Sequence, residues 1–574
     1  MNLFENYLTV IKKKVLIHKD IVGSISSRNL KNVIIEKPPE NYDFDLSSNI
    51  ALVLGKNEGR NPREIAEKIK GVLSKEIKDF SMVEIAGPGF LNIKLSKEAW
   101  IKNINNIFKN KKNFGSIKNK SKYNIEFVSA NPTGPLHVGN CRGAIFGDVI
   151  SNLLIFNGNK VTKEFYVNDY GNQINIFSES VFYRLREIKF NENFPNNKNL
   201  YPGSYIIDIA KKILKKNPKI KLDNLKKIKK KLTKDSINYS MNLIKSDLKR
   251  LGIKHDKFFY ESEIVKKNLI KKSLKKLISE KLVLEDFLQP PKGEENLNWK
   301  KSKKLVFKST LYGDDSDRSL QKEDGSWTYF ANDLAYHSNK ISRKYDYLIN
   351  ILGADHTGYI QRITAAVKAI SKNKTKLTCK VCQLVKLFKN GQPFKMSKRL
   401  GEFISVDELL NEVDKDSIRF MMLNRSNDVE LDFDFSKVLE KNKDNPVFYI
   451  QYCYARINSL FRSLKINLNK EIRINLNNFE PNIYEYRLLR KIIEWPKIVD
   501  SASNRLEPHR INFYLYDLAT IFHSYWSEGN KKMEYKFIID GQINKKLSFK
   551  IFQSISIILE NGMKILGVKL PNKM

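Results

Sequence analysis

The chain has 574 residues, too many for one hydrophobic core, so we expect two to four domains. Its apolar content of 41% suffices for several cores and excludes a disordered chain. The formal net charge of +39 favours a polyanionic partner such as nucleic acid, although drift in composition explains the excess charge equally well, because Lys, Asn and Ile are abundant everywhere.

The first 110 residues or so mix helix and strand patterns. The segment PREIAEKIKGVLSKEI (62–77) predicts an amphipathic helix with Pro62 at its first position. The next segment, VEIAGPGFLNIKL (83–95), predicts two strands around a Gly-Pro-Gly turn. The Lys-rich stretch 108–122 is expected to be a linker.

From Tyr123 to about Arg399, strand and helix patterns alternate, which predicts βαβ units and a parallel sheet. The expected strands are YNIEFV (123–128), KVTKEFYVN (160–168) and YDYLINIL (345–352). A helix follows the first of them and ends at Gly158. A long insertion is expected at about 175–300, and its lysine run is either a solvated helix face or an RNA contact.

The last part of the chain, from about residue 440, has a helical pattern. PHRINFYLYDLATIFHSYW (508–526) predicts a helix with Pro508 in its first turn and its apolar residues on one face. Residues 466–482 are a polar break between helices.

Cysteine usage and hydropathy limit the metal sites and the cellular compartments that the sequence allows. Cys379 and Cys382 form a single CxxC, but zinc needs two more ligands and the sequence has no second CxxC and no HxxxH, so we expect no structural zinc. Cys141 and Cys453 are isolated, which fits a reducing compartment. No apolar run approaches the ~20 residues that span a bilayer, and the start of the chain lacks the order of a signal peptide. We expect a cytoplasmic protein with no membrane contact.

One turn carries a strong chemical signal, SANPTGPLHVGNCRGAI (129–145). A strand, a bend rich in Gly and Pro and a helix start are the arrangement that binds phosphates in α/β proteins, because a helix N-terminus offers free N–H groups. Gly139 would let a ligand approach the backbone, and His137 and Asn140 can both donate hydrogen bonds to one anion. A structural turn with a capping histidine is an equal alternative for this segment alone.

A second candidate segment is FKNGQPFKMSKRLGEF (388–403). Asn390-Gly391 is a hairpin signal. The residues Lys395, Ser397 and Lys398 place cations and a hydroxyl on a loop, where they suit the developing charge of a pyrophosphate. Alone, such a basic loop is common.

Together, the two segments resemble a known family. HVGN resembles the HIGH signature and KMSKR the KMSKS signature of class I aminoacyl-tRNA synthetases. The flanking residues are similar to those of arginyl-tRNA synthetases, and the resemblance covers essentially the whole chain. The further motifs are EFVSANPTGPLHVGN (126–140), YVNDYGNQ (166–173), YPGSYI (201–206), LYGDDSDRSL (311–320), DGSWTYFANDLAYH (324–337) and GADHTGYIQR (353–362).

The resemblance implies an α/β fold in three parts. These are an N-terminal α+β domain that contacts tRNA (1–110), a Rossmann-type catalytic domain with a parallel sheet (111–440), and an all-α anticodon-binding domain (441–574). It also implies ATP-dependent formation of arginyl-adenylate, with Mg²⁺ accompanying ATP, and then transfer to the terminal ribose of tRNA(Arg). L-arginine, ATP and tRNA(Arg) are the expected partners. The family is usually monomeric, and no obligate protein partner is expected.

The resemblance also implies roles for individual residues. The expected catalytic residues are His137, Asn140, Lys395, Ser397 and Lys398. The expected ATP-binding residues are Pro132, Gly134, His137, Gly139, Asn140, Met396 and Lys398. The expected arginine-binding residues are Glu126, Ser129, Asn131, Tyr329, Asp333, His356 and Gln361. Chemistry agrees with the acids in this set, because a planar, permanently charged guanidinium needs carboxylates that can pair with it in a bidentate way.

Three functional hypotheses stay open at this point. The first is an active arginyl-tRNA synthetase, and the second is another class I adenylating enzyme, such as a cysteinyl- or glutamyl-type synthetase. The third is a catalytically impaired tRNA-binding relative. Asn140 supports the third, because the family signature usually has a second histidine there, whereas His137 and the KMSKR segment argue against it.

Overall fold

The computed structural model describes residues 2–18, 21, 30–39, 42–287, 303–394 and 404–574. The chain divides into two compact units. The first unit comprises residues 1–117, 441–565 and 569–574, and the second comprises 118–440 and 566–568. The candidate phosphate-loop residues Lys395, Met396, Ser397 and Lys398 lie outside the described residues.

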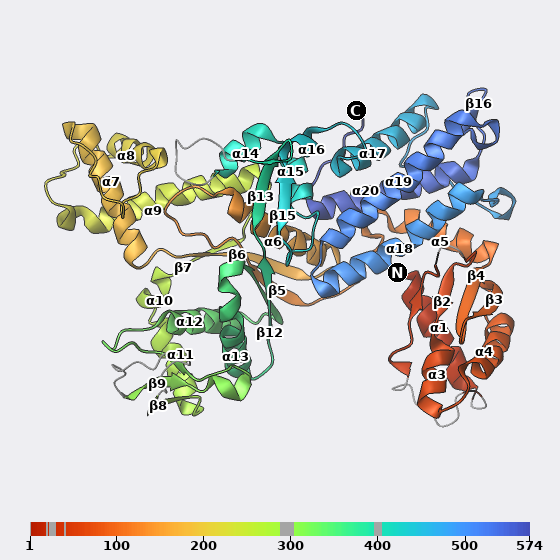
Figure 1. Cartoon of the computed structure of the whole chain (residues 1–574), viewed down its shortest axis with the longest axis horizontal. Helices are drawn as coiled ribbons and strands as arrows, with labels where there is room; N and C mark the ends of the chain where they lie inside the picture. The colour runs from red at the N-terminus through yellow and green to blue at the C-terminus, as the bar shows by residue number, and fades with distance from the viewer. Residues whose placement is uncertain (1, 19–20, 22–29, 40–41, 288–302, 395–403) are drawn as a thin grey trace. The chain divides into compact units, whose positions relative to one another are not determined.

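A five-stranded parallel sheet forms the centre of the second unit (Figure 1). Its order is β12-β11-β5-β6-β7, so the chain crosses over on both sides of β5. This is the arrangement of a doubly wound fold, and the predicted parallel sheet is confirmed. The strands are β5 (Lys122–Glu126), β6 (Lys160–Val167), β7 (Lys257–Tyr260), β11 (Tyr347–Gly353) and β12 (Lys376–Cys382).

Helix α6 (Val138–Phe156) follows β5 and packs closely on the sheet. Its apolar residues recur at helical spacing and are fully buried, Ile145 and Val149 among them. Gly147 makes the close approach possible, because a Cβ there would lie 2.4 Å from the Phe127 ring. Gly158, with φ of 84°, follows the helix as expected.

Residues 172–250 form a helical arm on the second unit (Figure 1). It contains α7 (Asn172–Phe190), α8 (Ser204–Lys216) and the long α9 (Leu225–Arg250). The three helices bury a core of their own around Phe177, Ile206 and Leu232. The predicted insertion at 175–300 is not continuous, because β7 returns to the central sheet at residues 257–260 and pairs with β6.

Smaller elements complete the second unit. Asn390 and Gly391 have φ of 53° and 74°, and they form the predicted hairpin between β13 and β14. The remaining helices are α10 (Ser262–Lys266), α11 (Leu269–Ser279), α12 (Tyr329–Ser342), α13 (Ile360–Ser371), α14 (Val406–Glu412), α15 (Lys415–Met421) and α16 (Phe435–Leu439), with 3₁₀ turns η3 (Ser309–Tyr312) and η4 (Ala354–Tyr359). The remaining strands are β8 (Val283–Phe287), β9 (Lys303–Phe307), β10 (Arg318–Ser319), β13 (Val385–Lys389), β14 (Gln392–Pro393) and β15 (Leu431–Asp434).

The first unit combines an antiparallel sheet from the start of the chain with the C-terminal helices. Arg490 of α18 pairs with Asp45 at 3.0 Å, and Trp495 Nε1 donates to the Phe114 carbonyl oxygen. Pro508 precedes α19 rather than lying in its first turn. The sequence assigns these parts to two domains, and those boundaries stay predictions.

Helix α4, strands β3 and β4 and helix α19 agree with the elements predicted at 62–77, 83–95 and 508–526. The described elements of this unit follow one another along the chain. They are α1 (Leu3–Ile17), β1 (Ile35–Glu36), β2 (Leu46–Ser48), α3 (Ile50–Glu58), α4 (Pro62–Glu76), β3 (Phe80–Ala86), β4 (Phe90–Leu95), α5 (Lys97–Asn110), η2 (Lys111–Asn113), α17 (Pro446–Ser463), η5 (Leu476–Asn478), α18 (Ile483–Arg505), α19 (His509–Lys531), η6 (Met533–Tyr535), β16 (Ile538–Ile539), β17 (Gln542–Ile543) and α20 (Lys546–Leu566).

A buried ion cluster fastens α6 to four other segments of the second unit. Asp148 accepts from Arg419 and from Lys163, each at 2.6 Å, and all three side chains are largely buried. Arg419 also donates to the carbonyl oxygens of Leu251 at 3.0 Å and Leu566 at 2.9 Å. One carboxylate therefore holds two cations in place, and one of these cations, Arg419, also binds the C-terminal ends of helices α9 and α20.

We predict that Asp148→Ala lowers the free energy of unfolding of the second unit by about 3–5 kcal/mol, because it leaves two buried cations unpaired. Urea unfolding followed by circular dichroism measures the change. The matched control is Asp235→Ala, which removes a pair with the exposed Lys216 and should cost less than about 1 kcal/mol. Equal effects of the two substitutions would contradict the prediction.

Candidate functional site

The candidate site lies at the carboxyl edge of the parallel sheet. The segments that follow β5, β6, β7 and β11 meet there because all four strands run in the same direction. β5 lies between β6 and β11. The strands that follow β5 in sequence, β6 and β7, extend the sheet on one side, whereas β11 and β12 extend it on the other side, so the strand order reverses at β5. Ligands of doubly wound sheets bind at such a switch point.

The turn after β5 is strained and tightly fastened. Val128 and Ser129 both have positive φ, 71° and 42°, a conformation that costs about 1–3 kcal/mol per residue away from glycine. Ser129 Oγ secures the turn by donating to Glu126 Oε1 at 3.1 Å and accepting from the Tyr166 N–H at 3.1 Å. Strain of this kind persists where the surroundings hold the backbone, and here they place Ser129 beside a carboxylate.

His137 stands at the N-cap of α6, and its ring position requires a glycine nearby. A Cβ at residue 139 would lie 2.9 Å from the His137 ring, so Gly139 leaves room for the imidazole. Burial lowers the pKa of His137, so the ring is neutral at pH 7 and offers one N–H donor. Asn140 Oδ1 accepts from the His137 backbone N–H at 3.1 Å, which fixes the side-chain amide against the first turn.

Two distant segments support the same turn. The backbone N–H of Val138 donates to Ile404 at 2.9 Å, and Val406 donates to Leu136 at 3.0 Å, so the chain directly after residue 403 is paired to the turn. On the opposite side, Asp247 of α9 accepts from the Leu136 N–H at 3.0 Å. Gly134 packs against the Tyr205 ring of the YPGSYI motif, because a Cβ at residue 134 would lie 3.0 Å from that ring.

Glu126, at the end of β5, is already paired within the protein. Its Oε2 lies 2.5 Å from Nζ of the fully buried Lys340, which also donates to Asn350 Oδ1 at 3.1 Å. Asn350 in turn contacts His337 Nε2 at 3.1 Å. Burial lowers the pKa of His337 to about 3, so this histidine is a neutral packing residue behind the site. Glu126 therefore keeps a fixed orientation, with one oxygen on a lysine and the other on Ser129.

Two further carboxylates at this edge form no ion pair with any residue that the structure describes. Tyr359 donates a hydrogen bond to Asp333. Burial and the charge of Glu126 raise the pKa of Asp333 to about 6, although the hydrogen bond from Tyr359 lowers it. Glu261 accepts from Asn332 at 3.0 Å, and its pKa is raised to about 7 by burial and by the charges of Asp333 and Asp169. Each charge disfavours ionisation of its neighbour, so a cation bound among them would be strongly stabilised.

The other predicted arginine-binding residues are more exposed. Asn131 Nδ2 donates to Gln173 at 2.8 Å, and Gln361 Nε2 donates to the Gly313 carbonyl oxygen at 2.9 Å. Tyr329 is 78% exposed, and His356 lies 3.4 Å from the neighbouring Asp355. The structure therefore links Glu126 to Ser129 by a hydrogen bond and places Asp333 within the electrostatic influence of Glu126, whereas Asn131, Gln361 and His356 contact residues outside this group.

Sequence reasoning missed several members of the cluster, namely Tyr166, Glu261, Asn332, Lys340 and Tyr359. A usable signal was present for Glu261, which directly follows the aromatic strand KFFY and so stands at the carboxyl edge of β7. For Lys340 there was no local signal, because it meets Glu126 across 214 positions of the sequence.

The described part of the chain contains no group of three or more His, Cys, Asp or Glu side chains that could hold a metal ion. Cys379 and Cys382 are free thiols on β12, and burial raises the pKa of both to about 12. Within the same described residues, no helix has the length and apolar character needed to cross a membrane.

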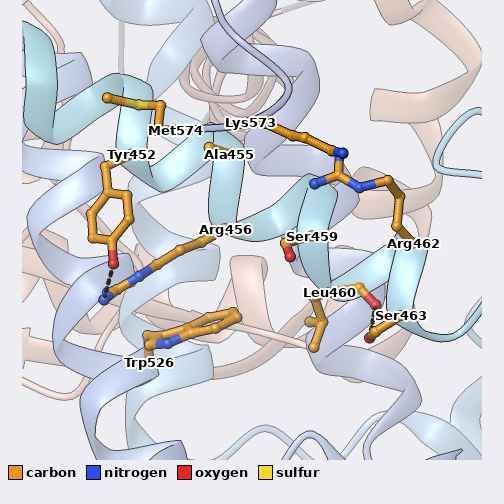
Figure 2. A pocket seen from close by; sticks show the side chains of 10 residues that line it. All are labelled: Tyr452, Ala455, Arg456, Ser459, Leu460, Arg462, Ser463, Trp526, Lys573 and Met574. Atoms are coloured by element: carbon orange, nitrogen blue, oxygen red, sulfur yellow. Dashed lines mark hydrogen bonds between the residues drawn. The ribbon is translucent and has the colours of Figure 1, made fainter.

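A second candidate site is a cavity of about 630 Å³ in the C-terminal helices (Figure 2). The Arg456 guanidinium lies over the Tyr452 ring at 4.1 Å and 5.5 Å from the Trp526 ring, and it donates to Tyr452 OH at 2.9 Å. Burial lowers the pKa of His523 to about 4, so its neutral Nδ1 accepts from Arg456 at 3.0 Å. Arg462 and Lys573 complete a wall that is both aromatic and basic.

Comparison with known families decides the class. A family model for the catalytic domain of class I (R) tRNA synthetases matches residues 103–459. The chain belongs to this family. Models for the arginyl-tRNA synthetase N-terminal domain and the DALR anticodon-binding domain match residues 11–95 and 450–574. The predicted fold class, a Rossmann-type domain between an N-terminal domain and a helical C-terminal domain, is confirmed.

Individual relatives agree. The chain is 51% identical to an arginine–tRNA ligase of Pelagibacter ubique and 42% identical to one of Bartonella bacilliformis, each over 100% of both chains. The solved Thermus thermophilus arginyl-tRNA synthetase has the same fold, with a TM-score of 0.70 at 19% identity over 98% of this chain and 100% of that one. These relatives give no support to the alternative of a catalytically impaired protein.

Proposed function

We propose that this protein attaches L-arginine to tRNA(Arg) in two steps, the first of which consumes ATP. The single observation that carries the proposal is the joint position of two features. A helix N-terminus with His137 and Asn140 lies at the same sheet edge as the Glu126, Asp333 and Glu261 carboxylates. The helix N-terminus suits a phosphate and the carboxylates suit a guanidinium. An arginyl-adenylate carries both of these groups.

In the first step, an arginine carboxylate oxygen attacks the α-phosphorus of ATP. A new O–P bond forms as the bond to pyrophosphate breaks. His137 would donate its one N–H to a phosphate oxygen, and Asn140, whose Oδ1 is held by the backbone, would present Nδ2 to the same group. Pro132, Gly134 and Gly139 would shape the turn around the nucleotide. Lys395, Ser397 and Lys398, with Met396, remain predicted participants.

In the second step, the terminal ribose hydroxyl of the tRNA attacks the arginyl carbonyl carbon and AMP leaves. Mg²⁺ would enter with ATP, since it binds phosphate oxygens and keeps several waters. A cytoplasmic monomer without an obligate protein partner completes the proposal.

Arginine specificity would come from the carboxylates. Asp333 would pair with the guanidinium, because it is partly buried and forms no ion pair with any of the described residues. Glu126, oriented by Lys340 and Ser129, would provide a second negative group at a fixed position. We add Glu261 as a third. Asn131, Tyr329, His356 and Gln361 are kept as contributors on the strength of the family resemblance.

The tRNA would place its anticodon on the C-terminal helices. The cavity beside Trp526 combines aromatic faces with Arg456 and Arg462, and such surfaces stack nucleobases while they neutralise phosphates. The match of residues 450–574 to an anticodon-binding domain supports this assignment.

Arginine-dependent charging of total tRNA tests the proposed function. We expect charging with arginine and none with cysteine or glutamate, and a protein that binds tRNA but charges nothing would overturn the proposal. The variant Asn140→His serves as the comparison, measured by pyrophosphate exchange with tRNA present. We expect turnover within about tenfold of the natural sequence, roughly 1.4 kcal/mol of barrier. Activity only in the histidine variant would mean that Asn140 has impaired the enzyme.

A pH profile tests Asp333. Its pKa of about 6 means that the carboxylate is charged above pH 6 and neutral below it, so kcat/KM for arginine should fall about tenfold per pH unit below that point. Asp333→Asn removes the charge at every pH. It should lower kcat/KM for arginine by about 30-fold or more at pH 8, since losing one partner of a desolvated charge pair costs about 2–5 kcal/mol. Unchanged arginine kinetics would place Asp333 outside the binding site.

Trp526→Ala tests the C-terminal cavity. Loss of one stacking face should raise the KM for tRNA by roughly 5–150-fold, corresponding to about 1–3 kcal/mol, and leave the KM for arginine unchanged. Phe513→Ala removes an exposed aromatic ring from the same helix and is the matched control. If the two variants behave alike, the cavity does not bind the RNA.

A further inference from the structure

The end of the helical arm that lies away from the sheet carries an unusual density of lysine. Twelve lysines and two aspartates occur between residues 211 and 235, and all twelve lysines are exposed. Only Lys216 forms an ion pair within this described segment, with Asp235 at 3.0 Å. On neighbouring α7, by contrast, Arg184 and Arg186 pair with Glu187 and Glu192.

The folding of α9 does not explain these lysines. Its first ten residues include six of them and no acid. The positive end of a helix dipole favours acidic side chains there, and like charges four residues apart, such as Lys226 and Lys230, repel each other. The arrangement therefore costs the helix stability, and an external polyanion would relieve that cost.

The apolar side of α9 shows which class of polyanion fits. Leu225, Ile228 and Leu232 pack into the arm's own core, so they cannot insert into a lipid surface as an interfacial helix must. What the exposed side offers is a dense row of cations, which matches closely spaced phosphates.

The other end of α9 leads to the active site. Asp247 accepts from the Leu136 N–H in the His137 turn, and Ser240 donates to Gly134 at 3.5 Å. From Lys226 to Asp247 the helix rises about 32 Å, at ~1.5 Å per residue. An RNA whose end enters the site is long enough to reach the lysines as well.

We propose that the exposed lysines of residues 211–234 are a docking surface for the phosphate backbone of tRNA. The choice of tRNA as the RNA rests on the proposed function. The surface differs from the C-terminal cavity in its chemistry, because it has no aromatic face for bases and is expected to bind without regard to sequence.

The test compares two triple variants with the same spacing. Lys226, Lys227 and Lys230 of α9 are changed to Gln in one protein, and Lys271, Lys272 and Lys275 of α11 in the other. Both sets are exposed, and both lower the net charge by three. Filter binding of total tRNA over a range of salt gives the slope of log K against log salt. Circular dichroism confirms that both variants are folded.

We expect the α9 variant to reduce this slope by about 2, since each phosphate contact contributes about 0.7–0.9. Its KM for tRNA should rise while its KM for arginine is unchanged, and the α11 variant should lose less than half as much slope. Equal losses in the two variants would make the effect one of net charge alone and overturn the proposal. Binding to phosphatidylserine vesicles that the α9 substitutions abolish, with tRNA binding intact, would also overturn it.

The outcome is independent of the proposed function. If the natural protein charges no tRNA with arginine, that function fails, and the difference between the two slopes still decides whether the arm binds RNA. If the natural protein charges tRNA and the α9 variant keeps the full slope, the arm proposal alone fails.

Discussion

At the carboxyl edge of the parallel sheet, buried carboxylates outnumber the cations that pair with them. Among the described residues there, Glu126 has Lys340, while Asp333, Glu261 and Asp169 form no ion pair. Burial and this excess of negative charge raise the pKa values of Asp333 and Glu261. A fold tolerates such a cluster only where the surrounding structure is rigid, and here strands from one parallel sheet supply the rigidity. The energy stored as mutual repulsion becomes affinity for a ligand that carries its own positive charge.

The sequence predicts the frame of this site well and its supporting contacts poorly. The strand ending in Glu126, the turn at His137 and helix α6 follow from local pattern, because period, glycine placement and capping act over a few residues. Asp333 follows from its motif. The cation on Glu126 and the chain paired to Val138 do not follow, since Lys340 and Ile404 lie more than 200 positions away. The same reason explains why β7 was hidden inside a predicted insertion, for a four-residue strand shows its role only through its partner β6.

Helix α9 gives the arm a mechanical relation to the chemistry. A continuous helix moves as one body, so a force on its lysine-bearing half acts on Asp247 and through it on the turn at Leu136. Burial raises the pKa of Asp247 to about 6, and the Leu136 N–H is the hydrogen bond that opposes this shift. The contact is therefore specific and directional, whereas the lysines at the far end need only electrostatic proximity. Helix α9 thus carries a directional hydrogen bond to the Leu136 turn at one end and the lysines proposed to bind the tRNA backbone at the other.

Asn140 illustrates how the first turn of α6 can accept a departure from its family. Its Oδ1 accepts from the His137 backbone N–H, and its Nδ2 carries two N–H donors. A neutral histidine at the same position would supply one acceptor and one N–H donor, so either side chain offers a donor for a phosphate. Two differences remain, reach and charge. A bridging water covers a shorter reach at a cost of ~0–2 kcal/mol, and an amide never gains the positive charge that a histidine acquires near pH 6.5. Because burial lowers the pKa of His137 as well, we expect the positive charge for the leaving pyrophosphate to come from the Mg²⁺ that accompanies ATP and from the predicted lysines of the KMSKR segment.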